Sequence, residues 1–111
     1  MRHLSKLILA CALITGCATA PAGPPPKWLS DAQAAVADAQ AAGADRVPAA
    51  QEHLQKAQAA LANATAGKGD PGLQASLATS EATLAKNIAV DAKVSADLQA
   101  ATNQLNALKA Q

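Results

Sequence analysis

Residues 71–109 read PGLQASLATSEATLAKNIAVDAKVSADLQAATNQLNALK, with no proline or glycine beyond the first two positions. Ala, Leu, Gln and Lys, which all favour helix, recur throughout this stretch. Asp70 precedes it and is suited to cap a helix whose first turn holds Pro71. The stretch therefore predicts one unbroken helix, about 58 Å long at 1.5 Å per residue.

Two apolar stripes follow one another along this expected helix. Four large apolar residues of the first half share one side: Leu73, Leu77, Leu84 and Ile88. In the second half a regular four-three-four-three spacing marks an interaction seam: Val94, Leu98, Ala101, Leu105 and Leu108. Polar Asn87 and Asp91 fall between the stripes, which we therefore interpret as distinct. A shorter preceding helix covers only the first half, so we expect the seam to pack on another copy or another protein, with a frayed, solvated helix as the alternative.

Two shorter helices are expected upstream of this long one. The first covers about residues 30–43, with Ser30 and Gln33 forming a capping box and Gly43 as a C-terminal stop. The second covers about residues 48–66 and starts at Pro48, which suits a first turn. Residues 29–39 repeat at 54–64, and repeated helices with short links stack as antiparallel neighbours. The fold class is therefore all-α, with three helices in antiparallel hairpins and a long C-terminal helix.

The composition excludes several classes of function. Net charge is +1 and no basic run occurs, which argues against nucleic-acid binding. His53 has no second ligand at helical spacing and is expected on the solvated side of its helix, beside a surface pair of Glu52 and Lys56. No nucleophile, acid and base are grouped together. We predict no enzyme, no metal and no cofactor other than a covalent lipid.

That lipid is predicted from the N-terminal residues. Basic Arg2 and Lys6 precede a short apolar run that ends in Ile14-Thr15-Gly16-Cys17, which has the form of a bacterial lipobox. Residues 1–16 are then a signal peptide cut between Gly16 and Cys17, and Cys17 receives diacylglycerol and an acyl chain such as palmitate. Residues 17–28 form a lipidated, proline-rich tether, and residues 29–111 form an alanine-rich helical domain.

Two bacterial families share these features. Residues 29–101 resemble small alanine-rich lipoproteins that carry a helical domain of unknown function. That resemblance rests on Ala41-Ala42-Gly43-Ala44, Val47-Pro48, Leu54, Ala57 and Leu61. A weaker resemblance is to the major murein lipoprotein, an uninterrupted coiled coil whose last lysine joins peptidoglycan. This chain departs from that pattern, because Gly43, Pro48 and the glycines after residue 66 interrupt its helices, and Lys109 is followed by two further residues.

The resulting expectation is a non-enzymatic structural or adaptor module of the cell envelope. Ala18 follows the lipidated cysteine, and lipoproteins without aspartate there usually proceed to the outer membrane; inner-membrane retention is the alternative. The module would face the periplasm, held to the membrane by its N-terminal lipid. The competing function is an oligomeric coiled-coil spacer between the outer membrane and peptidoglycan. A homo-oligomer, an envelope protein and peptidoglycan are thus the expected partners.

Overall fold

A computed structural model describes residues 23–111 of the chain. Its elements are α1 (Lys27–Ala41), the 3₁₀ turn η1 (Ala44–Arg46), α2 (Pro48–Thr65) and α3 (Pro71–Lys109). The described part contains no strand, so the predicted all-α class is confirmed. The predicted bounds of α3 are also right, and the predicted end of α2 differs from the observed end by one residue. The predicted signal peptide, Cys17 and the rest of the first half of the tether, residues 18–22, lie outside the described residues.

Helix α1 begins three residues before the predicted start, and the predicted capping box is wrong. Its N-cap is Pro26, in polyproline geometry at φ −53° and ψ 147°, and no side chain caps the helix. Instead, Ser30 Oγ lies 3.5 Å from the carbonyl of Pro26 within the helix. Proline already holds φ near the helical value, so the helix can begin directly after it. The ammonium of Lys27 lies 2.7 Å from Asp31 Oδ2, which supports the early first turn.

The other helix ends follow the sequence signals. Gly43 and Gly67 adopt positive φ values of 86° and 68° after α1 and α2, a conformation that costs glycine little. Beyond Gly67, the Lys68 amide donates to the carbonyl of Asn63 at 2.9 Å, which closes a Schellman turn. Asp70 Oδ1 accepts from the Leu73 amide at 3.1 Å and caps α3 as expected.

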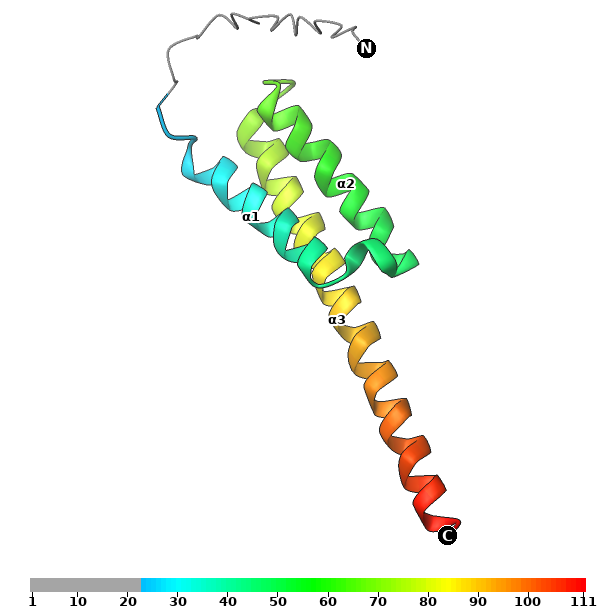
Figure 1. Cartoon of the computed structure of the whole chain (residues 1–111). Coiled ribbons are helices and arrows are strands. Elements are labelled where there is room, and N and C mark those ends of the chain that lie inside the picture. The colour runs from blue at the N-terminus through cyan, green and yellow to red at the C-terminus, as the bar shows by residue number, and fades with distance from the viewer. Residues whose placement is uncertain (1–22) are drawn as a thin grey trace, which may run out of the picture.

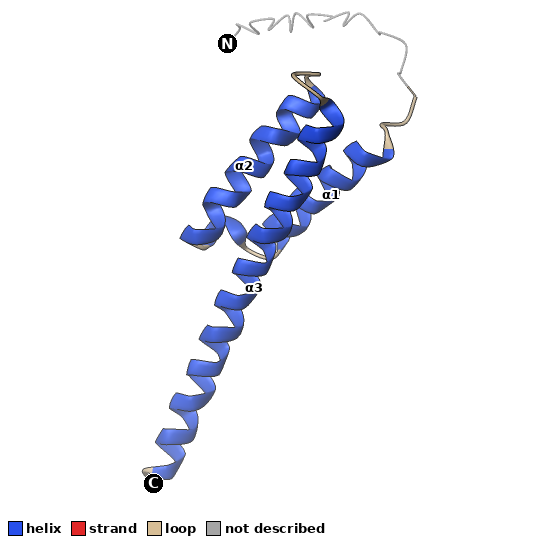
Figure 2. Ribbon diagram, turned by 180° about the vertical axis from the view of Figure 1, so that it is seen from behind, coloured by secondary structure: helices blue, strands red, loops and turns tan. Residues whose placement is uncertain are grey.

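Helices α1 and α2 both pack on the first half of α3, and the second half of α3 extends beyond them (Figures 1 and 2). Successive helices run in opposite directions, as the short links predict. We call residues 93–109 of α3 the stalk, because every one of them is exposed. We call α1, η1, α2 and residues 71–92 of α3 the body. The chain therefore has a compact three-helix end and a single-helix end.

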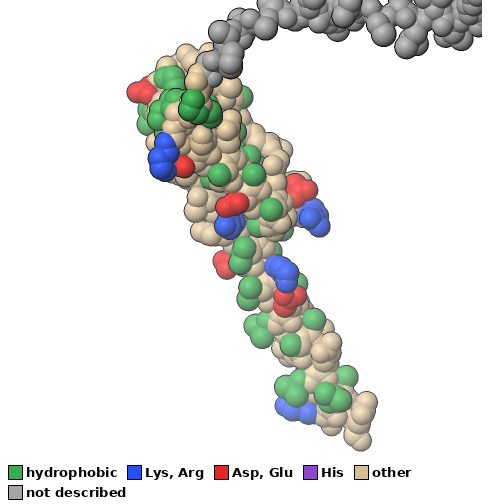
Figure 3. All heavy atoms as spheres, turned by 60° about the vertical axis from the view of Figure 1, so that its left-hand side comes forward, with side chains coloured by type: hydrophobic (Ala, Val, Ile, Leu, Met, Phe, Trp, Pro, Cys, Tyr) green, Lys and Arg blue, Asp and Glu red, His purple; other side chains and the backbone are tan. Residues whose placement is uncertain are grey.

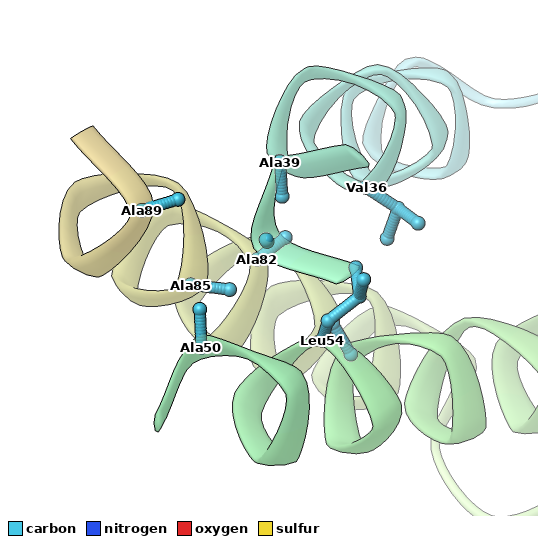
Figure 4. Packing of buried hydrophobic residues seen from close by; sticks show 9 residues of the cluster. Val36, Ala39, Ala50, Leu54, Ala82, Ala85 and Ala89 are labelled. Atoms are coloured by element: carbon cyan, nitrogen blue, oxygen red, sulfur yellow. The ribbon is translucent and has the colours of Figure 1, made fainter. Parts of the chain in front are cut away.

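The body is packed mainly by alanine. Its buried alanines on α3 are spaced by threes and fours: Ala75, Ala78, Ala82, Ala85 and Ala89. Figure 4 shows Ala39 of α1, Ala50 of α2 and Ala85 of α3 directed into the space between the three helices. The largest buried side chains are Leu54 and Val36, which lie in the same cluster. Small side chains let the three helix backbones approach closely.

The leucines of the first half of α3 do not form the core that their spacing predicts. Leu73, Leu77 and Leu84 are exposed, and only Ile88 packs partly against the core cluster. The predicted face is therefore wrong for α3. Its neighbours α1 and α2 lie on the alanine side, where the space between helices has room for methyl groups. In α1 and α2, by contrast, larger apolar residues share the buried face with alanine, with Ala32 and Val36 buried on α1 and Leu54 and Ala57 on α2.

Candidate interaction surface

The predicted interaction seam lies on the stalk, where no other described part of the chain covers it. Its four large members are between 50% and 67% exposed: Val94, Leu98, Leu105 and Leu108. Ala101 between them is exposed as well. Residues spaced by fours and threes share one side of a helix, so the five side chains form one apolar line. Apolar side chains recur along the stalk in the space-filling view (Figure 3).

The line continues backwards along α3 in the same register. The preceding positions at four-three spacing are all exposed: Leu73, Leu77, Ser80, Leu84, Asn87 and Asp91. The interpretation of two distinct stripes, with the first one covered by the body, is therefore wrong. Leu73, Leu77 and Leu84 of the first stripe belong to the same exposed face as the seam, interrupted by three polar residues, whereas Ile88 is half-buried.

The buried alanines and this exposed face lie on nearly opposite sides of α3. At 3.6 residues per turn, the mean directions of the two sets differ by about 170°. The alanine side is occupied by α1 and α2, whereas the leucine side is open along the helix. Helix α3 therefore has two apolar faces, and only one is used within the body.

Few charges border the seam. The Lys93 ammonium lies 2.6 Å from Asp97 Oδ2, so these two exposed charges neutralise each other beside the seam. The Thr102 hydroxyl donates to the carbonyl of Leu98 at 2.9 Å, so it is satisfied by its own helix. Asp91 and Lys109 lie at the two ends of the seam, before Val94 and after Leu108. A partner would therefore meet leucine and alanine in the middle and opposite charges at the ends.

A pair of titratable side chains joins α2 to α3 in the body. His53 Nδ1 lies 2.7 Å from Glu81 Oε2, and about a quarter of each side chain is exposed. The expectation that His53 lies on the solvated side of α2 is therefore wrong. Its partner is on another helix 28 residues away, and no local pattern in the sequence could identify it. The pair is a side-chain contact between α2 and α3.

The predicted surface pair on α2 is present. Lys56 Nζ donates to Glu52 Oε1 at 2.7 Å. This hydrogen bond, and then the charge of Lys56, lower the pKa of the Glu52 carboxyl below its usual value. The same hydrogen bond and the charge of Glu52 raise the pKa of the Lys56 ammonium. Both side chains are at the surface, so the pair contributes little to stability.

Two shallow hollows lie beside α3. One, of about 390 Å³, is at the junction of body and stalk, between Gly43, Val47 and Ala89, with Arg46 and Lys93 at its edge. The other lies beside Trp28, against Ala75 and Thr79. Trp28, at the start of α1, thus lies near the first turns of α3. No group of three His, Cys, Asp or Glu side chains within residues 23–111 is arranged to hold a metal ion.

The predicted lipidation and cleavage residues, Gly16 and Cys17, lie outside the described residues. Within the described helices, none has a stretch that is both long enough and apolar enough to cross a bilayer. Comparison with protein-family models, curated proteins and solved structures finds no match to this chain.

Proposed function

We propose that this protein is a lipid-anchored structural or adaptor module of the bacterial cell envelope, and that its stalk binds a protein partner. The observation that carries the binding role is the seam, a line of large apolar side chains on a helix that no other described element covers. Contiguous exposed apolar surface of this kind marks interaction sites. A seam with four-three spacing fits a partner helix.

The anchoring role rests on the lipobox-like Ile14-Thr15-Gly16-Cys17 and the apolar run before it. Two or three acyl chains on Cys17 would hold the protein stably, because each buried CH₂ contributes about 0.8 kcal/mol. Pro24, Pro25 and Pro26 would then space the body from the lipid surface. The outer membrane, on its periplasmic side, is the proposed location, since Ala18 rather than aspartate follows Cys17.

Metabolic labelling in a bacterial host tests the anchor. The parent chain should incorporate labelled palmitate and sediment with membranes, and Cys17→Ser should abolish both. Cys11→Ser is the matched control, since Cys11 lies within the predicted signal peptide and its replacement should change neither result. An unlabelled parent chain that stays in the soluble fraction would contradict the anchoring proposal.

A second candidate function is an oligomeric spacer between the outer membrane and peptidoglycan. The observation that favours it is the length of the exposed face, which runs from Leu73 to Leu108 and suits a long coiled coil. Photocrosslinking from the stalk in cells separates the two functions. Adducts to proteins alone, a second copy included, favour the structural or adaptor module, whereas adducts to peptidoglycan favour the spacer.

A further inference from the structure

We propose that the seam binds the seam of a second copy of this chain, with the two stalks antiparallel. This inference rests on the proposed function, because it names the partner of the same surface. The two copies are related by a twofold axis that passes between Gln99 and Ala100. The stalk of each copy then extends towards the body of the other.

The polar residue Asp91 decides the relative direction of the two stalks. It occupies the position directly before Val94 in the four-three spacing of the apolar line. In a parallel, in-register pair Asp91 would face Asp91 of the second copy within the seam. Like charges placed opposite each other without a partner are unfavourable. An antiparallel pair separates the two carboxylates to opposite ends of the interface.

One antiparallel register matches four of the five seam residues with apolar ones. With the axis between Gln99 and Ala100, Val94 faces Leu105 of the second copy, and Leu98 faces Ala101. Each contact occurs twice by symmetry. A shift of the axis by half a heptad towards the body places Asn87 and Asp91 opposite apolar residues. An equal shift towards the C-terminus also pairs four seam residues but leaves Val94 unpaired. The register with the axis between Gln99 and Ala100 keeps all five seam residues within the interface, with Asp91 opposite Leu108 at each end.

The same register brings opposite charges together. Asp91 lies next to Leu108 and Lys109 of the second copy, and symmetry repeats this pair at the other end. Asp91 is exposed, and no ion pair forms between it and another side chain of the described residues. Lys109 is likewise exposed at the end of α3. The charges that border the seam are therefore complementary in this arrangement.

The body leaves room for the second copy. Helices α1 and α2 occupy the alanine side of α3, about 170° away from the leucine side in mean direction. A helix that lies against the seam thus meets the open side of α3, even where the stalk of one copy ends beside the exposed Asn87 and Val90 of the other. Two bodies then lie at opposite ends of the paired stalks.

Disulfide trapping in cells tests the direction and the register. Two full chains carrying different short C-terminal tags are co-expressed, one as Val94→Cys and the other as Leu105→Cys, and oxidised in situ. The antiparallel register predicts a disulfide between the two tagged chains and none between two Val94→Cys chains. The parent chain without an added cysteine is the background control. Gln99→Cys paired with Asn106→Cys, on the other side of the stalk at the same seven-residue spacing as Leu98 and Leu105, should not crosslink.

Each outcome decides the proposal. A disulfide between two Val94→Cys chains, without the mixed product, would show a parallel pair and overturn the antiparallel arrangement. No disulfide in any combination would overturn pairing of the seams. Palmitate labelling of the same chains reports the anchor separately, so loss of crosslinking with labelling intact defeats this inference and leaves the anchoring proposal standing.

A charge exchange provides a second test on the same full chains. Asp91→Lys alone and Lys109→Asp alone should each lower the yield of the mixed disulfide severalfold, because like charges then meet at both ends. The double variant Asp91→Lys with Lys109→Asp should restore the yield. Additive losses in the double variant would contradict the predicted contact between these two residues.

Discussion

Alanine determines how closely the three helices of the body pack. The alanines that face α1 and α2 are fully or almost fully buried, whereas leucines on the same helix are exposed. A methyl group at each contact allows short distances between backbones, and dispersion contacts of many atoms then replace a few large side chains. The body therefore tolerates little increase in side-chain size at these positions.

Ala82→Leu should destabilise the body, because Ala82 is fully buried between helices. We expect a loss of about 1–3 kcal/mol in the free energy of unfolding, the usual cost of overpacking a filled core. Urea denaturation followed by circular dichroism measures this change. Ala96→Leu is the matched control on the exposed stalk and should change stability by less than about 0.5 kcal/mol. Equal stability of both variants would contradict a tightly packed alanine core.

The contact of His53 with Glu81 should be measurable as a coupling between α2 and α3. A double-mutant cycle of His53→Ala and Glu81→Ala is expected to give about 0.5–1.5 kcal/mol, typical of one partly buried hydrogen bond. The cycle of His53→Ala with Asp97→Ala on the stalk is the control and should give no coupling. A zero value for the first cycle would mean that the pair does not hold the helices together.

Loss of the Glu52–Lys56 pair should change how the Glu52 carboxyl titrates. Lys56→Met should raise the pKa of the Glu52 carboxyl towards its usual value, because it removes both the hydrogen bond and the charge that lower it. The carboxyl ¹³C shift followed against pH by NMR measures this, and Lys68→Met in the α2–α3 turn is the control. An unchanged Glu52 titration in Lys56→Met would refute the pairing.

The sign of the pH effect follows from both shifts. The lowered pKa of Glu52 adds stability above the ordinary pKa of glutamate, and this is lost as pH falls through the lowered value. The raised pKa of Lys56 adds stability below the ordinary pKa of lysine, and this is lost as pH rises through the raised value. The pair therefore contributes to stability throughout the neutral pH range, and this contribution is small because both side chains are exposed.

At the scale of elements, helix ends and helix lengths were predictable because local residues determine them. Gly43 and Gly67 end the helices that precede them, and Asp70 caps the start of α3. The unbroken sequence after Pro71 forms one helix. The start of α1 was not predictable from its polar residues, because Pro26 takes the cap position without a side-chain hydrogen bond. The exposed seam was predictable because no shorter helix could cover all of α3.

The buried face of α3 was not predictable from apolar spacing. In most sequences leucines mark the core and alanines are neutral, but here both sets recur at helical spacing. Which set is buried depends on the small space left by α1 and α2, and that depends on tertiary packing. The His53–Glu81 contact was missed for the same reason, since it joins residues on separate helices.

The stalk should exchange its amide hydrogens in a way that depends on association. Alone, a single helix without tertiary contacts opens easily, so residues 94–108 should exchange faster than residues 75–89. Raising the protein concentration should slow exchange in the stalk and leave the body unchanged. Leu98→Asp with Leu105→Asp is the control that should keep the stalk fast at all concentrations. A stalk that is slow in a proven monomer would contradict the need for a partner.

At the scale of the molecule, the two faces of α3 have different roles. The alanine face builds the body, and the leucine face remains open to other molecules along the helix. In the proposed antiparallel pair, the stalks form the centre and the bodies the two ends. With the anchor that the N-terminal sequence predicts, each end of that assembly would be tethered to lipid, which suits a structural element that lies along a membrane.

Sedimentation equilibrium on residues 18–111, made without lipid, tests most directly whether the seam binds a second copy. The account predicts a dimer whose population rises with concentration and which is lost in Leu98→Asp with Leu105→Asp. Gln99→Asp with Asn106→Asp has the same spacing and charge on the other side of the stalk, and it should remain dimeric. A folded monomer at every concentration, or a dimer that survives the seam variant, would contradict the account.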